Sequence, residues 1–263
     1  MLIMKSITTK LINDNFQNFK RYGIPKAQLV IADIPYNIGN NFYGSNPMWY
    51  KNGDSKNGES KLAGKAAFNS DFNFNIAEYF HFCNRLLKKE PKKAGARGRS
   101  SDAPCMIIFC AFEQIESVKN YAKKYGFKNS IPLVFIKNYS PQVLKANMRI
   151  CGNTEYALLF YRDKLPKFNN NGQMVFNSMP MYRDTVTPKI HPTQKSIHTL
   201  KHLIKLFTDE NEVVIDPCAG SGSTLLACKQ TNRRGYGFEI KKEFVKQFNE
   251  QLMSNVQMEM NLF

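Results

Sequence analysis

The stretch Val213-Val214-Ile215-Asp216-Pro217-Cys218-Ala219-Gly220-Ser221-Gly222-Ser223-Thr224 decides the fold of this chain of 263 residues. It begins with an apolar run that is typical of a buried strand. A Gly-x-Gly turn follows, and then a predicted helix over residues 223–230. Small residues at such a turn let a ligand approach the backbone, and the N–H groups of the helix face that ligand. Glu239 ends the next predicted strand, about 20 residues on, where an acid usually binds ribose hydroxyls. The stretch therefore predicts a nucleoside site at the end of a buried strand.

The class of nucleoside follows from what this turn lacks. A dinucleotide site needs a third small residue where Leu225 stands, and a P-loop needs a Gly-Lys-Ser/Thr that is missing here. Asp216 at the strand end would repel a diphosphate and attract a cation. S-adenosylmethionine carries a sulfonium, an ammonium and a ribose but no phosphate. Its charges therefore fit an acid at each strand end.

Predicted strands and helices alternate through most of the chain. Apolar runs predict strands at 28–33, 105–111, 131–136, 212–215 and 235–239, and helical spacing predicts helices at 14–21, 74–89, 112–126, 196–207, 223–230 and 242–252. This alternation implies an α/β fold with a mostly parallel sheet covered by helices on both faces. Residues 137–190 differ, because they combine many asparagines, scattered basic residues and one strand-like run at 155–161. We expect them to form a small irregular lobe within a single domain, 1–263.

A second short stretch, Asp33-Ile34-Pro35-Tyr36, follows an apolar run and suits the binding of a planar group that carries an amine. The Asp33 carboxylate can accept a hydrogen bond from an N–H. Ile34 precedes a proline, so its backbone is extended and its carbonyl could accept the second N–H of the same amine. Tyr36 could stack on the ring that bears the amine. An ordinary junction between a strand and a turn remains the alternative at this point.

The charge of the chain favours a polyanionic partner. Its 37 Lys and Arg against 21 Asp and Glu give a net charge of +16, and nucleic acid is the usual partner of such an excess. We expect phosphate contacts from two basic regions, the loop 88–99 and the segment 137–190. The side chains concerned are those of Lys92, Lys93, Arg97, Arg99, Lys145, Arg149 and Arg183. A merely solvated loop is the alternative for residues 88–99.

Other classes of protein find little support. The six cysteines include no CxxC pair, and His198 and His202 have no evident third ligand, so we expect no metal site and no disulfide framework. No apolar run approaches the roughly 20 residues that span a bilayer, and the N-terminus lacks the pattern of a signal peptide. We therefore expect a cytoplasmic protein without a membrane partner. The polar tract 37–70, directly after Tyr36, is expected to act as a lid or a substrate-contacting arm.

Three motifs together resemble those of the β group of S-adenosylmethionine-dependent DNA amino-methyltransferases. Asp33–Tyr36 resembles the catalytic Asp-Pro-Pro-Tyr motif of that family, and Asp216–Ser223 is similar to its cofactor motif. The segment His191-Pro192-Thr193-Gln194-Lys195 is similar to the His-Pro-Thr-Gln-Lys-Pro segment that precedes the cofactor motif. The resemblance covers residues 28–250, in the order that is typical of the β group. Ile34 and Ser196 each stand where the family has a proline.

The resemblance implies a Rossmann-like methyltransferase fold. It also implies an adenine-specific, site-specific DNA methyltransferase that flips its target base out of double-stranded DNA. It divides the chain into a catalytic half, 28–136, a target-recognition region, 137–190, and a cofactor-binding half, 191–252. The catalytic residues would be Asp33, Ile34, Pro35 and Tyr36. The residues that bind S-adenosylmethionine would be His191, Thr193, Lys195, Asp216, Pro217, Cys218, Ala219, Gly220, Ser221, Gly222, Ser223 and Glu239.

Several alternatives remain open on the sequence alone. Cytosine-N4 methylation uses the same apparatus, although the aspartate that opens the tetrapeptide is usual for adenine enzymes and a serine for cytosine enzymes. A non-catalytic nucleic-acid-binding protein that retains a cofactor fold is the alternative from another class. A restriction endonuclease and a second copy of the chain are the further partners that the resemblance brings into question.

Overall fold

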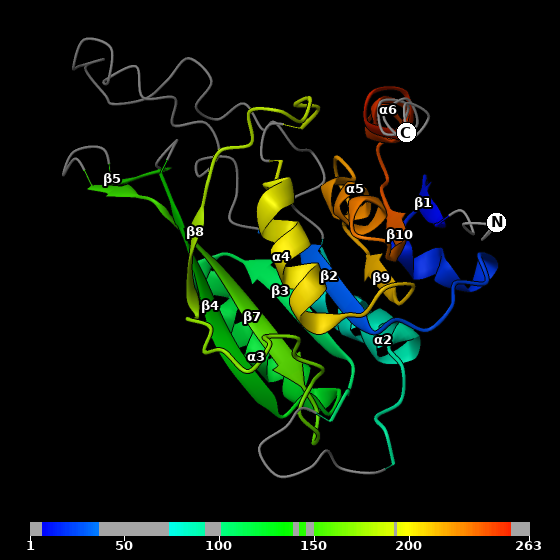
Figure 1. Ribbon diagram of the computed structural model, residues 1–263, viewed down its shortest axis with the longest axis vertical. Helices are drawn as coiled ribbons and strands as arrows, with labels where there is room; N and C mark the ends of the chain where they lie inside the picture. The colour runs from blue at the N-terminus through cyan, green and yellow to red at the C-terminus, as the bar shows by residue number, and fades with distance from the viewer. Residues whose placement is uncertain are drawn as a thin grey trace.

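A single eight-stranded sheet forms the centre of the computed structural model, which describes residues 7–36, 74–92, 101–138, 142–145, 150–191 and 194–253. Its strands lie in the order β1-β10-β9-β2-β3-β7-β4-β8 (Figure 1). Their bounds are β1 Thr9–Ile12, β2 Leu29–Asp33, β3 Cys105–Cys110, β4 Asn129–Lys137, β7 Thr154–Tyr161, β8 Ser178–Met181, β9 Val213–Asp216 and β10 Arg234–Phe238. All neighbours are parallel except that β7 runs antiparallel to both β3 and β4. The expected α/β fold with a mostly parallel sheet is confirmed.

Helices cover both faces of this sheet. The helices η1 Phe16–Arg21, α2 Ile76–Leu86 and α3 Ile115–Lys124, the last preceded by η3 Phe112–Gln114, pack on one face. The helices α4 Ile197–Phe207 and α5 Ser223–Gln230 and the C-terminal turn η5 Phe248–Met253, which follows α6 Lys242–Gln247, pack on the other. Each predicted helix thus corresponds to an observed helical segment.

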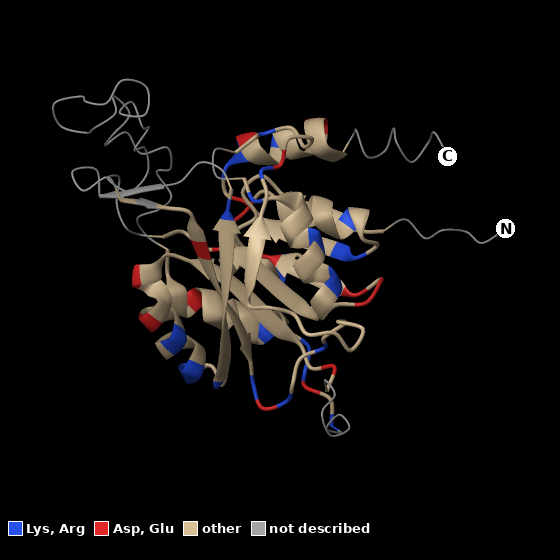
Figure 2. Ribbon diagram, turned by 60° about the vertical axis from the view of Figure 1, so that its left-hand side comes forward, with Lys and Arg blue, Asp and Glu red and all other residues tan. Residues whose placement is uncertain are grey.

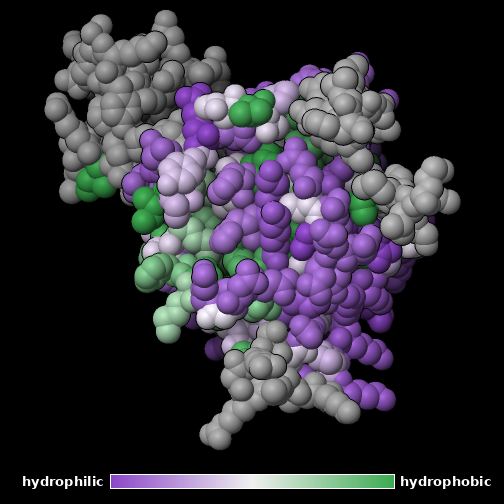
Figure 3. All heavy atoms as spheres, in the orientation of Figure 1, coloured by the Kyte–Doolittle hydropathy of each residue, from purple (hydrophilic) through white to green (hydrophobic). Residues whose placement is uncertain are grey.

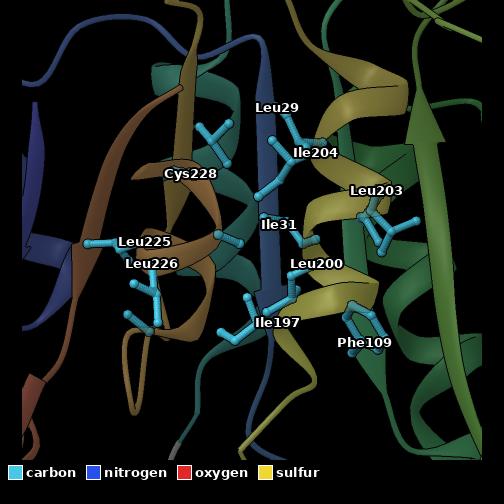
Figure 4. Packing of buried hydrophobic residues seen from close by; sticks show 14 of the residues in the cluster. Leu29, Ile31, Phe109, Ile197, Leu200, Leu203, Ile204, Leu225, Leu226 and Cys228 are labelled. Atoms are coloured by element: carbon cyan, nitrogen blue, oxygen red, sulfur yellow. The ribbon is translucent and has the colours of Figure 1, made fainter. Parts of the chain in front are cut away.

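The central strands are buried on both sides, which explains why they appear in the sequence as continuous apolar runs. In β2, Leu29 and Ile31 point to the face covered by α4 and α5, whereas Val30 and Ala32 point to the face covered by α2. Figure 4 shows Leu200 and Ile204 of α4 beside Leu29 and Ile31. Each such side chain contributes roughly 1.5–3 kcal/mol when it leaves water. This packing fixes the position of β2, and with it the residues at its end.

The segment expected as an irregular lobe is only partly irregular. Its strands β7 and β8 belong to the central sheet, while β5 Gln142–Lys145 and β6 Ile150–Gly152 form a separate two-stranded sheet. β7 lies inside the sheet because it has apolar side chains on both sides: Ala157 and Leu159 on one face, Leu158 and Phe160 on the other. The irregular part is therefore smaller than the range 137–190.

Strand β1 lies in a region for which the sequence analysis predicted no strand. Its four residues pair with β10, and only Leu11 and Ile12 are buried. Two apolar residues give no periodicity from which a strand could be predicted.

At the edge of the sheet opposite β1, hydrophobic residues gather over β4 and β8, whereas much of the rest of this face is hydrophilic (Figure 3). Exposed apolar side chains there include Ile131 and Ile136 of β4, with Met174 and Phe176 just before β8.

In the described part of the chain, no helix combines the length and the apolar character that crossing a membrane requires.

Gly237 tests how tightly β10 packs on the segment that follows β9. A methyl group at this position would lie 2.6 Å from Leu225 Cδ1, 2.9 Å from Ala219 Cβ and 3.3 Å from the Asp216 carbonyl oxygen. We expect Gly237→Ala to lower the free energy of unfolding by about 1–3 kcal/mol, the usual cost of overpacking, as measured by urea denaturation. Gly235→Ala in the same strand is the control, because its closest contact would be looser, at 3.1 Å. An equal or larger loss in the control would contradict this interpretation.

Candidate active site at the carboxyl ends of the strands

The candidate site lies at the point where the direction of the chain through the sheet reverses. β2 and β9 are neighbours; from β2 the chain continues outward to β3, and from β9 it continues outward in the other direction to β10. In parallel α/β sheets, ligands bind at the carboxyl ends of strands at such a switch point. Asp33 ends β2, Asp216 ends β9, and Glu239 follows β10. The fold therefore brings three acidic residues from distant parts of the sequence to one edge.

The segment from Asp216 to Ser223 forms the tight turn between β9 and α5 that the sequence predicted. Gly220 and Gly222 adopt positive φ angles of 50° and 74°, a conformation that other residues rarely adopt. The amide of Gly222 donates to the Ala219 carbonyl at 2.7 Å, and a side chain at Gly222 would overlap the ring of Phe248. The predicted residues Pro217, Cys218, Ala219 and Ser221 lie in the same turn. The side chains of this turn are small, and the rings of Phe248 and His191 pack against its two glycines.

The Asp216 carboxyl is almost fully buried beneath this turn, with 4% of the residue exposed. It accepts a hydrogen bond from the Cys218 amide at 3.0 Å. Burial raises the pKa of Asp216 to about 7, and the charges of Asp33 and Glu239 act in the same direction, against hydrogen bonds from Thr224 and Cys218. An acid in this state gains from a nearby cation. The site therefore favours a cationic ligand, as the sequence analysis expected.

Glu239 is held beside the glycine turn by backbone groups. Its Oε1 accepts a hydrogen bond from the Lys241 amide at 2.7 Å, and its carboxylate also accepts one from the Gly220 amide. Asn13, just after β1, donates to the Glu239 carbonyl at 2.9 Å. The short strand β1, which the sequence analysis did not predict, thus helps to hold Glu239, which the sequence analysis did predict as a site residue.

His191 packs against the same turn. Its imidazole lies 3.9 Å from the position that a Cβ on Gly220 would occupy, and its ring centre lies 4.7 Å from that of Phe244. Burial, together with the charges of Lys241, Lys195 and Lys189, lowers the pKa of His191 to about 4. The imidazole is therefore neutral at neutral pH. Thr193 lies outside the described residues, so its predicted role stays a prediction.

The tetrapeptide Asp33–Tyr36 is fixed to the neighbouring strand. The Ile34 amide donates to the Phe109 carbonyl at 3.1 Å, and the Ile34 side chain is buried. Gln114 Nε2 donates to the Pro35 carbonyl at 2.9 Å while Gln114 Oε1 accepts from the Ala111 amide at 3.1 Å. Gln114, which the sequence analysis did not single out, therefore locks the turn after β3 onto the tetrapeptide. The Tyr36 hydroxyl lies 3.3 Å from Asp33 Oδ1.

The side chain of Lys195 forms an ion pair with that of Asp33. Its Nζ is 3.0 Å from Asp33 Oδ2 and 2.6 Å from Glu155 Oε2, and Glu155 Oε1 is 3.2 Å from Lys137 Nζ. The sequence analysis placed Lys195 among the cofactor residues and missed Glu155 and Lys137. One signal was present: Glu155 is a charged residue at the start of an otherwise apolar strand. Because β7 is antiparallel, the start of this strand lies at the edge where β2 ends.

Ser196, which follows Lys195, has a φ of −61°, a value that the proline of the family motif would also adopt.

The predicted phosphate contacts are only partly visible. Lys92 and Arg183 are exposed, and the Lys92 carbonyl accepts a hydrogen bond from Lys164 Nζ at 2.6 Å. Lys93, Arg97, Arg99 and Arg149 lie outside the described residues, as do the Lys145 side chain and the tract 37–70. Figure 2 shows the described Lys and Arg residues spread over helices and loops with Asp and Glu between them. No group of three or more potential metal ligands occurs in the part of the chain that the structure describes.

Comparison with known proteins identifies the family. Residues 27–250 match the family profile of N6 and N4 amino-methyltransferases that is described as DNA methylase. The chain belongs to this DNA methylase family. The methylase is 27% identical over 254 residues to DNA adenine methyltransferase YhdJ of Escherichia coli, a match that spans 90% of the present chain and 80% of YhdJ. It is 51% identical to type II methyltransferase M.HindIII of Haemophilus influenzae over 138 residues, 50% of this chain and 45% of M.HindIII.

Solved structures share the fold. The complex of M1.HpyAVI with S-adenosylmethionine matches with a TM-score of 0.65 and 22% identity over 92% of this chain and 99% of that one. The cytosine-N4-specific PvuII DNA methyltransferase matches with a TM-score of 0.65 and 14% identity over 94% of this chain and 88% of that one. S-adenosylmethionine is the cofactor of the family, as the sequence predicted. Its cationic groups suit the buried acid at Asp216.

The raised pKa of Asp216 predicts that binding of S-adenosylmethionine depends on pH. Below pH 7 the carboxyl is increasingly protonated in the free protein, so affinity for a cation should fall by up to about tenfold per pH unit. Titration calorimetry at pH 6 and pH 8 should show weaker binding at pH 6, with proton release into the buffer.

Asp216→Asn should bind weakly and lose most of the difference between the two pH values. Asp163→Asn is the control, because Asp163 is an exposed partner of Lys128 and its removal should leave the profile unchanged. A wild-type pH dependence that persists in Asp216→Asn would show that another group causes it.

Proposed function

We propose that the methylase transfers a methyl group from S-adenosylmethionine to the exocyclic N6 amine of adenine, at a specific sequence in double-stranded DNA. The observation that carries this proposal is the position of Asp33 and Tyr36 at the carboxyl end of β2. This end lies beside the glycine turn that follows β9. An amine held at Asp33 would therefore lie next to a cofactor held by the turn. The proposed catalytic residues are Asp33, Ile34, Pro35 and Tyr36.

The chemistry of an aromatic amine explains what these residues would do. Its lone pair is delocalised into the ring, so it is a poor nucleophile. Hydrogen bonds from its two N–H groups to the Asp33 carboxylate and the Ile34 carbonyl favour the geometry in which the lone pair is available. These acceptors also stabilise the positive charge that develops on the nitrogen. Tyr36 would stack on the base. The cofactor supplies an electrophilic methyl group, and the residues around it place that group in line with the amine.

The proposed cofactor site uses His191, Thr193 and the turn Asp216–Ser223, with Glu239 binding the ribose. Lys195 was expected in this set, and its contacts with Asp33 and Glu155 now favour a role at the catalytic tetrapeptide. The reaction also requires that the target base leave the helix, because the amine is not accessible to a buried carboxylate inside a duplex.

The choice of adenine rests on Asp33 at the start of the tetrapeptide and on the likeness to YhdJ along most of the chain. The fold does not discriminate between the two bases, since the cytosine-N4-specific PvuII enzyme shares it. Similarity to type II methyltransferases favours protection of DNA against a restriction endonuclease as the biological role.

Methylation of DNA by the purified protein tests the proposal. Incubation with S-adenosylmethionine and genomic DNA, followed by digestion and nucleoside mass spectrometry, should yield N6-methyladenine. Asp33→Ala should lower the rate by at least about 10²-fold and leave the affinity for S-adenosylmethionine within a few fold.

The outcomes separate the parts of this proposal. N4-methylcytosine without N6-methyladenine would overturn the choice of base. No methylated nucleoside at all would overturn the enzymatic function in favour of a non-catalytic DNA-binding role. A duplex with a mismatch at the target base should bind more tightly than the matched duplex, because less pairing energy is lost when that base is flipped.

We further propose that Lys92, Lys93, Arg97, Arg99, Lys145, Arg149 and Arg183 contact DNA phosphates. Replacement of Lys92, Lys93, Arg97 and Arg99 together by glutamine should weaken binding to all sequences alike. The slope of log affinity against log salt should fall by about 0.9 for each phosphate that the variant no longer neutralises. Fluorescence anisotropy at several salt concentrations measures this slope. An unchanged slope would assign the loop 88–99 to the solvated surface.

A further inference from the structure

Four charged side chains of alternating sign form a continuous chain that ends at Asp33. Asp33 comes from β2, Lys195 from the segment before α4, Glu155 from β7 and Lys137 from the end of β4. The three links measure 3.0 Å, 2.6 Å and 3.2 Å. The side chains of Lys195, Lys137 and Glu155 are only 12%, 14% and 19% exposed, and that of Asp33 is 28% exposed. The charges sum to zero, which is the condition under which buried ions are tolerated.

Lys195 is shared unequally between its two acids. Its Nζ lies closer to Glu155 than to Asp33, and it also lies 4.9 Å from the centre of the Phe109 ring, which holds it as a cation–π partner. Glu155 is anchored in turn by Lys137. Lys195 contacts Oδ2 of Asp33, whereas Oδ1 faces the Tyr36 hydroxyl at the longer distance of 3.3 Å. Lys195 is therefore paired more closely with Glu155 than with Asp33, the proposed catalytic acid.

We propose that Lys195 is a positioning residue that orients the Asp33 carboxylate, and that Glu155, anchored by Lys137, limits how strongly Lys195 neutralises it. This inference rests on the proposed function of Asp33 as the acceptor of the amine protons. With Oδ2 held by Lys195, Oδ1 accepts the longer hydrogen bond from the Tyr36 hydroxyl and keeps a second lone pair for the amine of the substrate. With Glu155 drawing on the same lysine, Asp33 keeps enough negative charge to attract a proton. A carboxylate bound to an unshared lysine would be a weaker acceptor.

The electrostatic surroundings of Asp33 agree with this balance. Burial raises the pKa of Asp33, Lys195 lowers it and Glu155 raises it. The other groups that face Asp33 are Tyr36 on its own segment, Asp216 of β9 and the thiols of Cys110 and Cys218, which burial keeps neutral. Burial also raises the pKa of Glu155, but Lys195 and Lys137 outweigh it and lower that pKa to about 2. Glu155 is thus ionised throughout the working range of pH.

The test compares variants that should shift Asp33 in opposite directions. Removal of the negative charge in Glu155→Gln should lower the pKa of Asp33, and removal of the positive charge in Lys195→Met should raise it. Lys137→Met should give a smaller shift in the same direction as Lys195→Met, because Glu155 then draws more strongly on Lys195. The acid limb of the plot of kcat against pH should move to lower pH in Glu155→Gln and to higher pH in Lys195→Met. In both variants, kcat at neutral pH should fall by about 10- to 100-fold, as when an orienting partner is lost.

Glu212→Gln is the matched control. Glu212 also bridges two lysines, with Lys88 at 2.7 Å and Lys167 at 3.2 Å, and its side chain is 17% exposed. It lies just before β9, at the opposite end of that strand from Asp216. This variant should lose thermal stability as Glu155→Gln does, but it should leave the acid limb of kcat unchanged.

Titration of the Asp33 carboxyl by carbon-13 NMR provides a readout that does not depend on activity. Opposite shifts in Glu155→Gln and Lys195→Met, with no shift in Glu212→Gln, would support the inference even if no methyl transfer were observed. Such a result would assign the failure to the proposed function alone. Equal shifts in both variants, or shifts in neither, would overturn the inference. If Lys195→Met does not fold, Lys137→Met and Glu155→Gln must still differ in sign.

Discussion

Three acidic residues at one edge of a parallel sheet are the constraint on which the rest of this structure depends. Strands that run in the same direction deliver their last residues to the same place, so Asp33, Asp216 and Glu239 meet although they are far apart in the sequence. The negative charges of Asp33 and Glu239 raise the pKa of Asp216, which burial raises already. The site is therefore built to receive positive charge. At Asp33, Lys195 supplies this positive charge. At Asp216, we propose that the cofactor supplies it.

This division separates the two halves of the site in chemical terms. The turn after β9 presents small residues, backbone amides and acids, which suits a cationic cofactor. The end of β2 is surrounded instead by aromatic rings, by Gln114 and by an internal network of paired charges. Strand β7 is what makes the second arrangement possible. Since it runs antiparallel between β3 and β4, its first residues reach the same edge as the last residues of β2.

The sequence predicted the elements that are buried on both faces and the turn with two glycines, because burial and positive φ angles restrict the choice of residue locally. It could not place β7 in the central sheet, since an apolar strand does not reveal its neighbours. It could not show β1, whose stability comes from backbone pairing with β10. Lys195 lies four residues after His191 in the same motif, and the resemblance to the family implied a role at the cofactor for both. In the structure His191 packs on Gly220 while Lys195 reaches Asp33. The place of Glu155 and Lys137 beside Lys195 is set entirely by tertiary contacts, so the sequence could not reveal it.

The base of the excursion between β4 and β7 has a consequence for how such a protein diversifies. Ile136 pairs with Thr154 across the two strands, the Lys137 amide donates to the Asn153 carbonyl at 2.7 Å, and Lys137 and Glu155 close the same junction as an ion pair. The segment that joins β4 to β7 therefore leaves the central sheet and returns to it at this one junction. The length and sequence of this segment can therefore change in evolution while the ion pair of Lys137 and Glu155 stays in place beside Lys195 and Asp33.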